Sequence, residues 1–185
     1  IVGLQELDAG SFRSEYVNQT DHIAKLANFS HSQHQTTRNF GPLAQHSKAL
    51  LSRLPILSYH HYSLPARLRG RGVTTFTLGG LNQEIFVVNA HLSLGRRAQL
   101  EQLGFIASLI EKHPNVIVMG DLNLTPSTLE VSPLANLHLA LNNVPTYPSW
   151  KPTKQLDYIL VSPSLRVINS GVLSCDYSDH LPVFA

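Results

Sequence analysis

The chain has only one cysteine, Cys175, among its 185 residues. It can therefore form no internal disulfide and no cysteine-based zinc site, and this scarcity favours a cytoplasmic protein. Long apolar runs are also missing, because none approaches the roughly 20 residues that a membrane-spanning helix needs. The first residues lack the basic segment and apolar core of a secretory signal. We expect a soluble protein with no membrane span.

A strong charge of either sign is absent, since 14 lysines and arginines face 12 acids and give a formal net charge of +2. This balance excludes a protein that binds nucleic acid by bulk electrostatics alone. Local basic segments remain, with Arg67, Arg69 and Arg71 in one and Arg96 and Arg97 in another. They are either solvated loop arginines or a patch that faces phosphate, and Arg71 is our candidate for a substrate contact.

Apolar runs rich in Val, Ile and Phe, bounded by Gly, Pro and Asn, recur along the chain and predict strands. They fall within residues 1–8, 48–64, 72–78, 84–92, 115–123, 156–162 and 181–185. The two runs at 72–78 and 84–92 flank a Gly-Gly-Leu-Asn-Gln connection and predict a hairpin. The run at 115–119 is apolar without alternation, which predicts a strand buried on both faces.

Helical spacing of apolar residues predicts two helices. The clearer one covers residues 96–112, ends before Pro114, and has a predicted inner face of Leu100, Leu103, Ile106, Ala107 and Ile110. The other covers residues 14–29, with a predicted inner face of Val17, Ile23, Leu26 and Ala27.

Strands in hairpins with helices between some of them predict an α/β (α+β) fold, a sandwich of two mixed sheets packed face to face and covered by helices. The length and the 43% hydrophobic content allow one domain over residues 1–185.

Polar clusters mark the ends of five predicted strands. They are Gln5 and Glu6, Asn89 and His91, Asp121 and Asn123, Asp157, and Asp179 and His180. In packed sheets such ends can converge at one rim, which is where ligands bind.

The residue types in these clusters indicate the chemistry. Carboxylate and amide oxygens suit Mg²⁺, with Mn²⁺ as the alternative. A histidine can donate to a phosphoryl oxygen or protonate a leaving oxygen, and Asp157 is our candidate partner for His180. Asp121 is placed to activate a water, and Asn123 to hold a phosphate oxygen.

The ordered motifs LQE, NAHL, GDLN, LDYIL and SDHLP resemble those of the endonuclease/exonuclease/phosphatase superfamily, over Gln5 to Pro182. The resemblance implies a four-layer α/β sandwich that hydrolyses phosphate esters with a divalent metal, usually magnesium. It implies metal ligands at Glu6 and Asp179. It implies catalytic roles for the remaining motif residues, which are His91, Asp121, Asn123, Asp157 and His180. Histidine at position 91, where abasic-site endonucleases carry tyrosine, favours the other branches.

Substrate contacts are expected from Asn89, Arg71 and Trp150. Trp150 lies in a loop before Asp157 that shapes the substrate pocket in similar proteins. That tryptophan either anchors a long loop or stacks on a base or lipid.

One departure from the family pattern concerns the start of the chain. Members carry a further strand before IVGLQE, ending in a metal-holding asparagine. We therefore expect a domain truncated at its N-terminus, whose 185-residue piece need not be active.

The expected function is metal-dependent hydrolysis of a phosphate ester, with nucleic acid, phospholipid and small phosphoesters all open as substrates and no obligate protein partner. The alternative is a non-catalytic phosphate-binding or partner-binding domain of the same fold.

Overall fold

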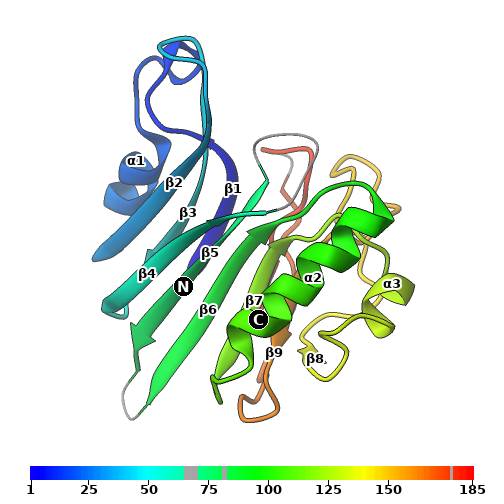
Figure 1. Cartoon of the computed structure of the whole chain (residues 1–185). Coiled ribbons are helices and arrows are strands. Elements are labelled where there is room, and N and C mark those ends of the chain that lie inside the picture. The colour runs from blue at the N-terminus through cyan, green and yellow to red at the C-terminus, as the bar shows by residue number, and fades with distance from the viewer. Residues whose placement is uncertain (65–70, 81–82, 176) are drawn as a thin grey trace. The chain divides into compact units, whose positions relative to one another are not determined.

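The computed structural model describes residues 1–64, 71–80, 83–175 and 177–185. The chain divides into two compact units, Ile1–Asn89 and Ala90–Ala185, whose helices and strands are labelled in Figure 1. The predicted arginines Arg67 and Arg69 lie outside the described residues. Among those residues, no helix is both long and apolar enough to pass through a bilayer.

The first unit contains two groups of paired strands. The three-stranded sheet has the antiparallel order β1-β3-β2, with β1 at Val2–Asp8, β3 at Gln45–Ser52 and β2 at His31–Asn39. The other group has the order β4-β5-β6, with β4 at Ile56–Ser63, β5 at Gly72–Gly79 and β6 at Glu84–His91, of which residues 84–89 belong to this unit. The predicted hairpin is confirmed as neighbouring strands β5 and β6, although residues 81–82 of its connection lie outside the described part.

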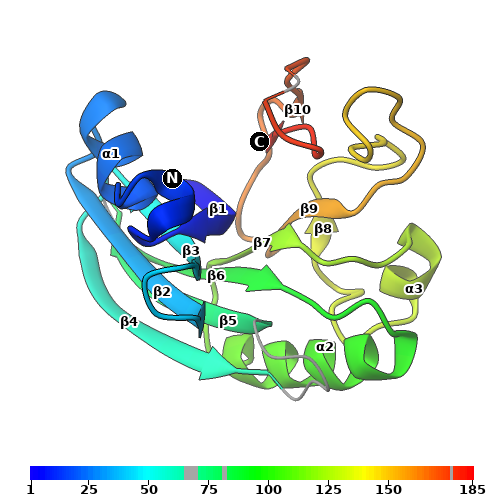
Figure 2. The same ribbon diagram turned by 90° about the horizontal axis from the view of Figure 1, so that it is seen from above.

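The two groups of strands face each other across a packed interior (Figure 2). Leu50 of β3 and Phe76 of β5 are both almost fully buried there. Polar contacts also cross between the groups, since the Asn89 amide donates to the carbonyl of Ala49 at 2.8 Å. The predicted α/β sandwich is therefore confirmed, with its core formed by inward-facing residues of both groups.

Helix α1 is shorter than the sequence predicts, covering Gln19–Leu26 rather than 14–29. The side chain of Asn18 caps it by accepting from the N–H groups of Thr20 and Asp21. The preceding loop is organised by the buried carboxylate of Asp8, which accepts hydrogen bonds from the backbone and hydroxyl of Ser11. This local bonding holds the loop out of the helix and delays the start of α1.

The predicted inner face of α1 is wrong. Thr20 and Ala24 are the buried residues, whereas Val17 is 42% and Leu26 is 70% exposed. The helix packs against the three-stranded sheet through its small residues, because a short side chain lets the backbones approach.

The second unit contains the strand order β7-β9-β8, with β7 at Val116–Asp121, β9 at Asp157–Val161 and β8 at His138–Leu139. Helix α2 at Arg96–Ile110 confirms the predicted helix and lies along one face of β7 and β9 in Figures 1 and 2. Helix α3 covers Pro126–Glu130. Strand β7 alternates between buried and half-buried residues, so only one of its faces is fully enclosed, unlike the prediction.

The predicted last strand is reduced to β11 at Val183–Phe184, which pairs with β10 at Gly171–Val172 in a separate two-stranded sheet. Asp179 and His180 therefore lie in a turn before a short strand rather than at the start of a strand of the larger sheet. Their position has to be maintained by side-chain and loop contacts.

Lys48 of β3 is buried in the first unit, with 3% of its surface exposed. Within the described part of that unit, its Nζ has no hydrogen-bond partner. A Cβ on Gly72 would lie 3.0 Å from this Nζ, so the amine faces the start of β5. Burial lowers the pKa of Lys48 from 10.5 to about 7, because the ammonium form loses its hydration. Burial and the Lys48 charge also lower the pKa of His61.

We predict that Lys48→Met stabilises the chain and flattens its stability between pH 7 and 10. The unfolded Lys48 keeps its proton up to pH 10.5 and the folded one only to about pH 7, so the wild-type free energy of unfolding rises with pH in this window. The rise is at most about 1.4 kcal/mol per pH unit. Methionine has a similar length and no charge, so its gain is largest near pH 7 and shrinks as pH increases.

Denaturant unfolding at about pH 7, 8 and 9 measures this difference. The exposed Lys25 of α1 provides the matched control as Lys25→Met. A Lys48→Met variant that is no more stable than wild type at pH 7, or that keeps the same pH slope, contradicts the prediction.

Candidate active site

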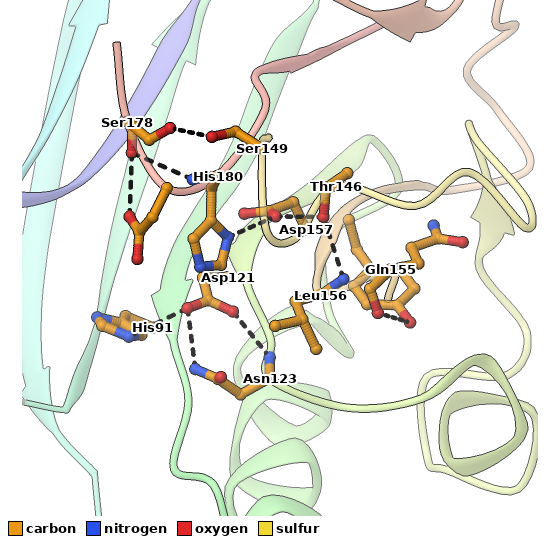
Figure 3. Close-up of polar contacts among 12 residues, drawn as sticks. His91, Asp121, Asn123, Thr146, Ser149, Gln155, Leu156, Asp157, Ser178 and His180 are labelled. Atoms are coloured by element: carbon orange, nitrogen blue, oxygen red, sulfur yellow. Dashed lines mark hydrogen bonds and ion pairs between the residues drawn. The ribbon is translucent and has the colours of Figure 1, made fainter. Parts of the chain in front are cut away.

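Pairing between β7 and β9 brings two of the predicted site residues together in the second unit. The strands run antiparallel, and the last residue of β7, Asp121, is the register partner of the first residue of β9, Asp157. Both carboxylates thus lie at the same end of this pair of strands (Figure 3). Two motifs that are 36 positions apart in the sequence become neighbours through strand register alone.

His180 is held against Asp157 as the sequence predicts. The Nδ1 of His180 lies 2.8 Å from Oδ2 of Asp157, and both side chains are largely buried. The hydrogen bond to Asp157 raises the pKa of His180, burial opposes it, and the charges of Asp157, Asp121 and Asp179 add to the increase. The imidazolium form of His180 is therefore favoured at this position.

The loop before β9 anchors the turn that carries His180. The Tyr147 ring packs against the His180 ring, with centroids 4.8 Å apart and planes 48° apart. The N–H of Ser149 donates to the carbonyl of Asp179 at 2.8 Å, and the Ser149 hydroxyl donates to the carbonyl of Ser178 at 2.6 Å. These contacts fix the position of the His180 turn, which the sequence analysis attributed to a strand that follows it.

His91 and Asn123 converge on Asp121. The Nε2 of His91 lies 3.3 Å from Oδ2 of Asp121, and both side chains are nearly buried. The Asn123 amide donates to Oδ2 of Asp121 at 2.9 Å and to the carbonyl of Leu92 at 3.2 Å, and its N–H donates to Oδ1 of Asp121 at 3.0 Å. This tight turn requires a φ of +53° at Asn123, a conformation that asparagine tolerates better than most residues.

Two glutamines of α2 support this arrangement, and the sequence analysis missed them. The Gln99 amide donates to the carbonyls of Ser93 and Asn123 at 2.9 and 2.5 Å. The Gln102 side chain accepts the N–H of Ser93 at 3.0 Å and donates to the Ser93 hydroxyl at 2.9 Å. Both glutamines are buried, although the helical pattern placed only apolar side chains on this face. A glutamine on the apolar stripe of an amphipathic helix is the signal that could have identified them.

A group of three potential metal ligands occurs among the described residues of this unit, namely Asp121, Asp157 and His180, whose ligand atoms lie within 4.8 Å of one another. The Nδ1 of His180 is bonded to Asp157, and a metal at that nitrogen would break this bond. We therefore interpret the group as an acid–histidine pair beside a second carboxylate, rather than as a metal cage.

The two predicted metal ligands lie in different units. In the first unit, Glu6 is exposed within a β-bulge between Leu4 and Leu7, with a φ of +56°. Bulges and such strained backbones are concentrated at sites where a side chain must be aimed. In the second unit, Asp179 is exposed and its Oδ1 accepts from the Ser178 hydroxyl at 3.3 Å.

The three predicted substrate residues differ in exposure. Trp150 is 73% exposed, so it is open to a ligand and does not anchor its loop. Arg71 is partly buried, and its Nη1 has no hydrogen-bond partner among the described residues. Asn89 is 0% exposed, and its amide binds Ala49, Leu4 and Gln5. The amide of Asn89 therefore holds the first unit together and is not accessible to a substrate in this structure.

Comparison with known proteins identifies the family. The model of the Endonuclease/Exonuclease/phosphatase family matches residues 1–180, and the chain belongs to that family. Its members are generally phosphoesterases. No curated protein sequence matches the chain significantly.

Solved structures share the fold at low sequence identity. An endonuclease/exonuclease/phosphatase from Beutenbergia cavernae is 21% identical with a TM-score of 0.77, and the match covers 98% of this chain and 60% of that one. TDP2 of D. rerio in complex with a single-strand DNA product is 17% identical with a TM-score of 0.71, covering 98% and 83%. A truncated TDP2 of Caenorhabditis elegans is 18% identical with a TM-score of 0.72, covering 98% and 81%. This chain thus spans about 60% of the length of the Beutenbergia protein.

We predict that Gly120→Ala strongly destabilises the second unit. Gly120 has a φ of +133°, and a Cβ there would lie 2.0 Å from the carbonyl oxygen of Ala90. The end of β7 would have to move away from residues 90–91, which also separates Asp121 from His91. The expected loss is roughly 3 kcal/mol or more in the free energy of unfolding.

Gly104→Ala in α2 is the matched control, because a Cβ at Gly104 meets nothing within 4 Å. That variant should be neutral or more stable by about 0.5–1 kcal/mol, since alanine favours the helix. Urea unfolding of both variants provides the comparison. Equal stability of the two would show that the close approach at Gly120 is tolerated.

Proposed function

We propose that this protein hydrolyses a phosphate ester with a divalent cation, through in-line attack of an activated water. The observation that supports this most directly is the assembly of the second unit's site. A histidine bonded to a carboxylate lies beside a carboxylate that is bonded to a second histidine and an amide. Phosphoryl transfer needs little covalent chemistry from the protein, so placement of charges and donors of this kind is the main requirement.

His180 is assigned to the phosphoryl group. Since its Nδ1 is engaged by Asp157, Nε2 is the nitrogen left to meet a substrate. The raised pKa of His180 favours an imidazolium that can donate to a phosphoryl oxygen and neutralise charge as the bond to the leaving group breaks.

Asp121 is assigned to the attacking water. Its carboxylate can accept a proton or orient the water, and the His91 ring 3.3 Å away can stabilise the charge or contact the phosphate. Both amide hydrogens of Asn123 are used within the protein, on Asp121 and Leu92. We therefore assign Asn123 first to orienting Asp121, and contact with the phosphate would require one of these bonds to exchange.

Glu6 and Asp179 are the carboxylates that we assign to the cation. Both side chains are exposed, and both offer the oxygen donors that suit Mg²⁺, with Mn²⁺ as the alternative. When bound, such a cation polarises the phosphoryl oxygen and lowers the pKa of a coordinated water.

Two observations bear on which class of phosphate ester the protein hydrolyses. Trp150 is exposed enough to stack on a base, and the similar TDP2 of D. rerio was solved with single-strand DNA. A nucleic acid is therefore the first substrate to test, with Arg71 as a candidate phosphate contact. Cleavage of nucleic acid should weaken steeply with salt, whereas a small phosphomonoester should respond little.

We predict that His180→Ala lowers metal-dependent turnover by a factor of about 10² or more, because the donor to the phosphoryl group is lost. Hydrolysis of a DNA oligonucleotide, a generic phosphodiester and a phosphomonoester is measured with Mg²⁺, with Mn²⁺ and with EDTA. The exposed His138 of β8 provides the control as His138→Ala, which should retain full activity.

The assay is run on this chain and on the full-length natural protein, because this chain spans about 60% of the Beutenbergia structure. Turnover that persists in EDTA or in His180→Ala contradicts the proposed mechanism. Binding of phosphate esters without hydrolysis in the full-length protein would favour the alternative, a non-catalytic phosphate-binding domain.

A further inference from the structure

We propose that Thr146 is the positioning residue of the site, whose hydroxyl holds the Asp157–His180 pair and selects the tautomer of His180. This inference rests on the proposed function and deepens it. Thr146 lies outside the motifs that the sequence analysis used, in the loop before β9, and it is 0% exposed.

The Thr146 hydroxyl is bonded on both sides. Its Oγ1 lies 2.6 Å from Oδ2 of Asp157, and it accepts the N–H of Leu156 at 3.2 Å. Because the Leu156 N–H can only donate, the hydroxyl hydrogen of Thr146 is free to point to Asp157. The hydroxyl therefore acts as a donor to Oδ2 of Asp157.

The same carboxylate oxygen meets His180. Nδ1 of His180 lies 2.8 Å from Oδ2 of Asp157, so this oxygen is an acceptor for both the Thr146 hydroxyl and the imidazole. The geometry then assigns the hydrogen to Nδ1 of His180. A neutral His180 has its lone pair on Nε2, and a protonated His180 donates from Nε2 towards the substrate.

The backbone of Thr146 bonds to the segments that flank Asp157 and His180. Its carbonyl accepts the N–H of Leu181, the residue after His180, at 2.8 Å, and its N–H donates to the carbonyl of Lys154 at 2.8 Å. One buried residue thus contacts the segments before Asp157 and after His180. These bonds limit how far the His180 turn can move.

Residues with this role affect chemistry more than substrate binding, because they set the position of a catalytic group without touching the ligand. Thr146→Val keeps the shape but removes the hydroxyl, leaving the Leu156 N–H and Asp157 each without one partner. Thr146→Ser restores the hydroxyl and omits only a methyl group. The two variants therefore separate hydrogen bonding from packing.

Ser162→Ala is the matched control. The buried Ser162 hydroxyl also accepts a backbone N–H, that of Val116 at 2.9 Å, but it lies just beyond the end of β9 that is remote from Asp157. It should lower stability to a similar extent as Thr146→Val without changing turnover. A purely structural role for Thr146 would make the two variants behave alike.

The first measurement is steady-state hydrolysis of the ester that the wild-type protein accepts. We expect Thr146→Val to lower kcat by about tenfold or more with KM within about twofold, whereas Thr146→Ser and Ser162→Ala stay within about threefold of wild type. Equal kcat in Thr146→Val and Ser162→Ala would overturn the inference, as would a Thr146→Ser variant as impaired as Thr146→Val.

The second measurement needs no activity. Nitrogen-15 NMR of the histidine side chains, at a pH where His180 is neutral, reports which nitrogen carries the hydrogen. The wild-type protein and Thr146→Ser should show the Nδ1–H tautomer of His180, and Thr146→Val should show a mixture with the Nε2–H tautomer. An unchanged tautomer in Thr146→Val, or an Nε2–H tautomer in the wild type, would overturn the inference. If the wild type hydrolyses no ester, the proposed function fails, and this measurement still judges Thr146.

Discussion

Oxygen Oδ2 of Asp157 accepts hydrogen bonds from Thr146 and from His180, and the arrangement of the site depends on this shared acceptor. Asp157 opens β9, where strand register pairs it with Asp121. The carboxylate thus joins a strand, the loop before it and the turn near the C-terminal end. A neutral side chain of the same shape would keep the packing but lose the charge that favours the protonated form of His180.

Some of the unusual backbone conformations lie at or beside candidate functional residues. Glu6 and Asn123 have positive φ angles without being glycine, and Gly120 precedes Asp121 with a φ of +133°. Such conformations cost energy and persist only where surrounding contacts maintain them. In the second unit those contacts are visible, because Gln99 holds the carbonyl of Asn123 and the chain at Ala90 passes against Gly120.

Two polar groups are buried inside the first unit, and they differ in whether hydrogen bonds offset the free-energy cost of their burial. The Asn89 amide is buried but bonded to two backbone carbonyls and to Gln5, so its burial is offset. The buried amine of Lys48 has no such partner within the described residues, and its burial lowers its pKa. Members of the family are generally phosphoesterases, and the substrate contacts proposed for this chain are the exposed Trp150 and the partly buried Arg71.

The sequence by itself determined the sandwich and the long helix at 96–110, and it named the candidate site residues, because hydrophobic periodicity and the spacing of polar motifs are local properties. Only the tertiary structure decided which atoms meet. It replaced the expected last strand with a turn held by the 146–149 loop, placed Thr146 on Asp157, and buried Asn89 away from ligands. These outcomes depend on contacts between residues far apart in the chain. Such contacts produce no periodic pattern or fixed spacing in the sequence from which they could be predicted.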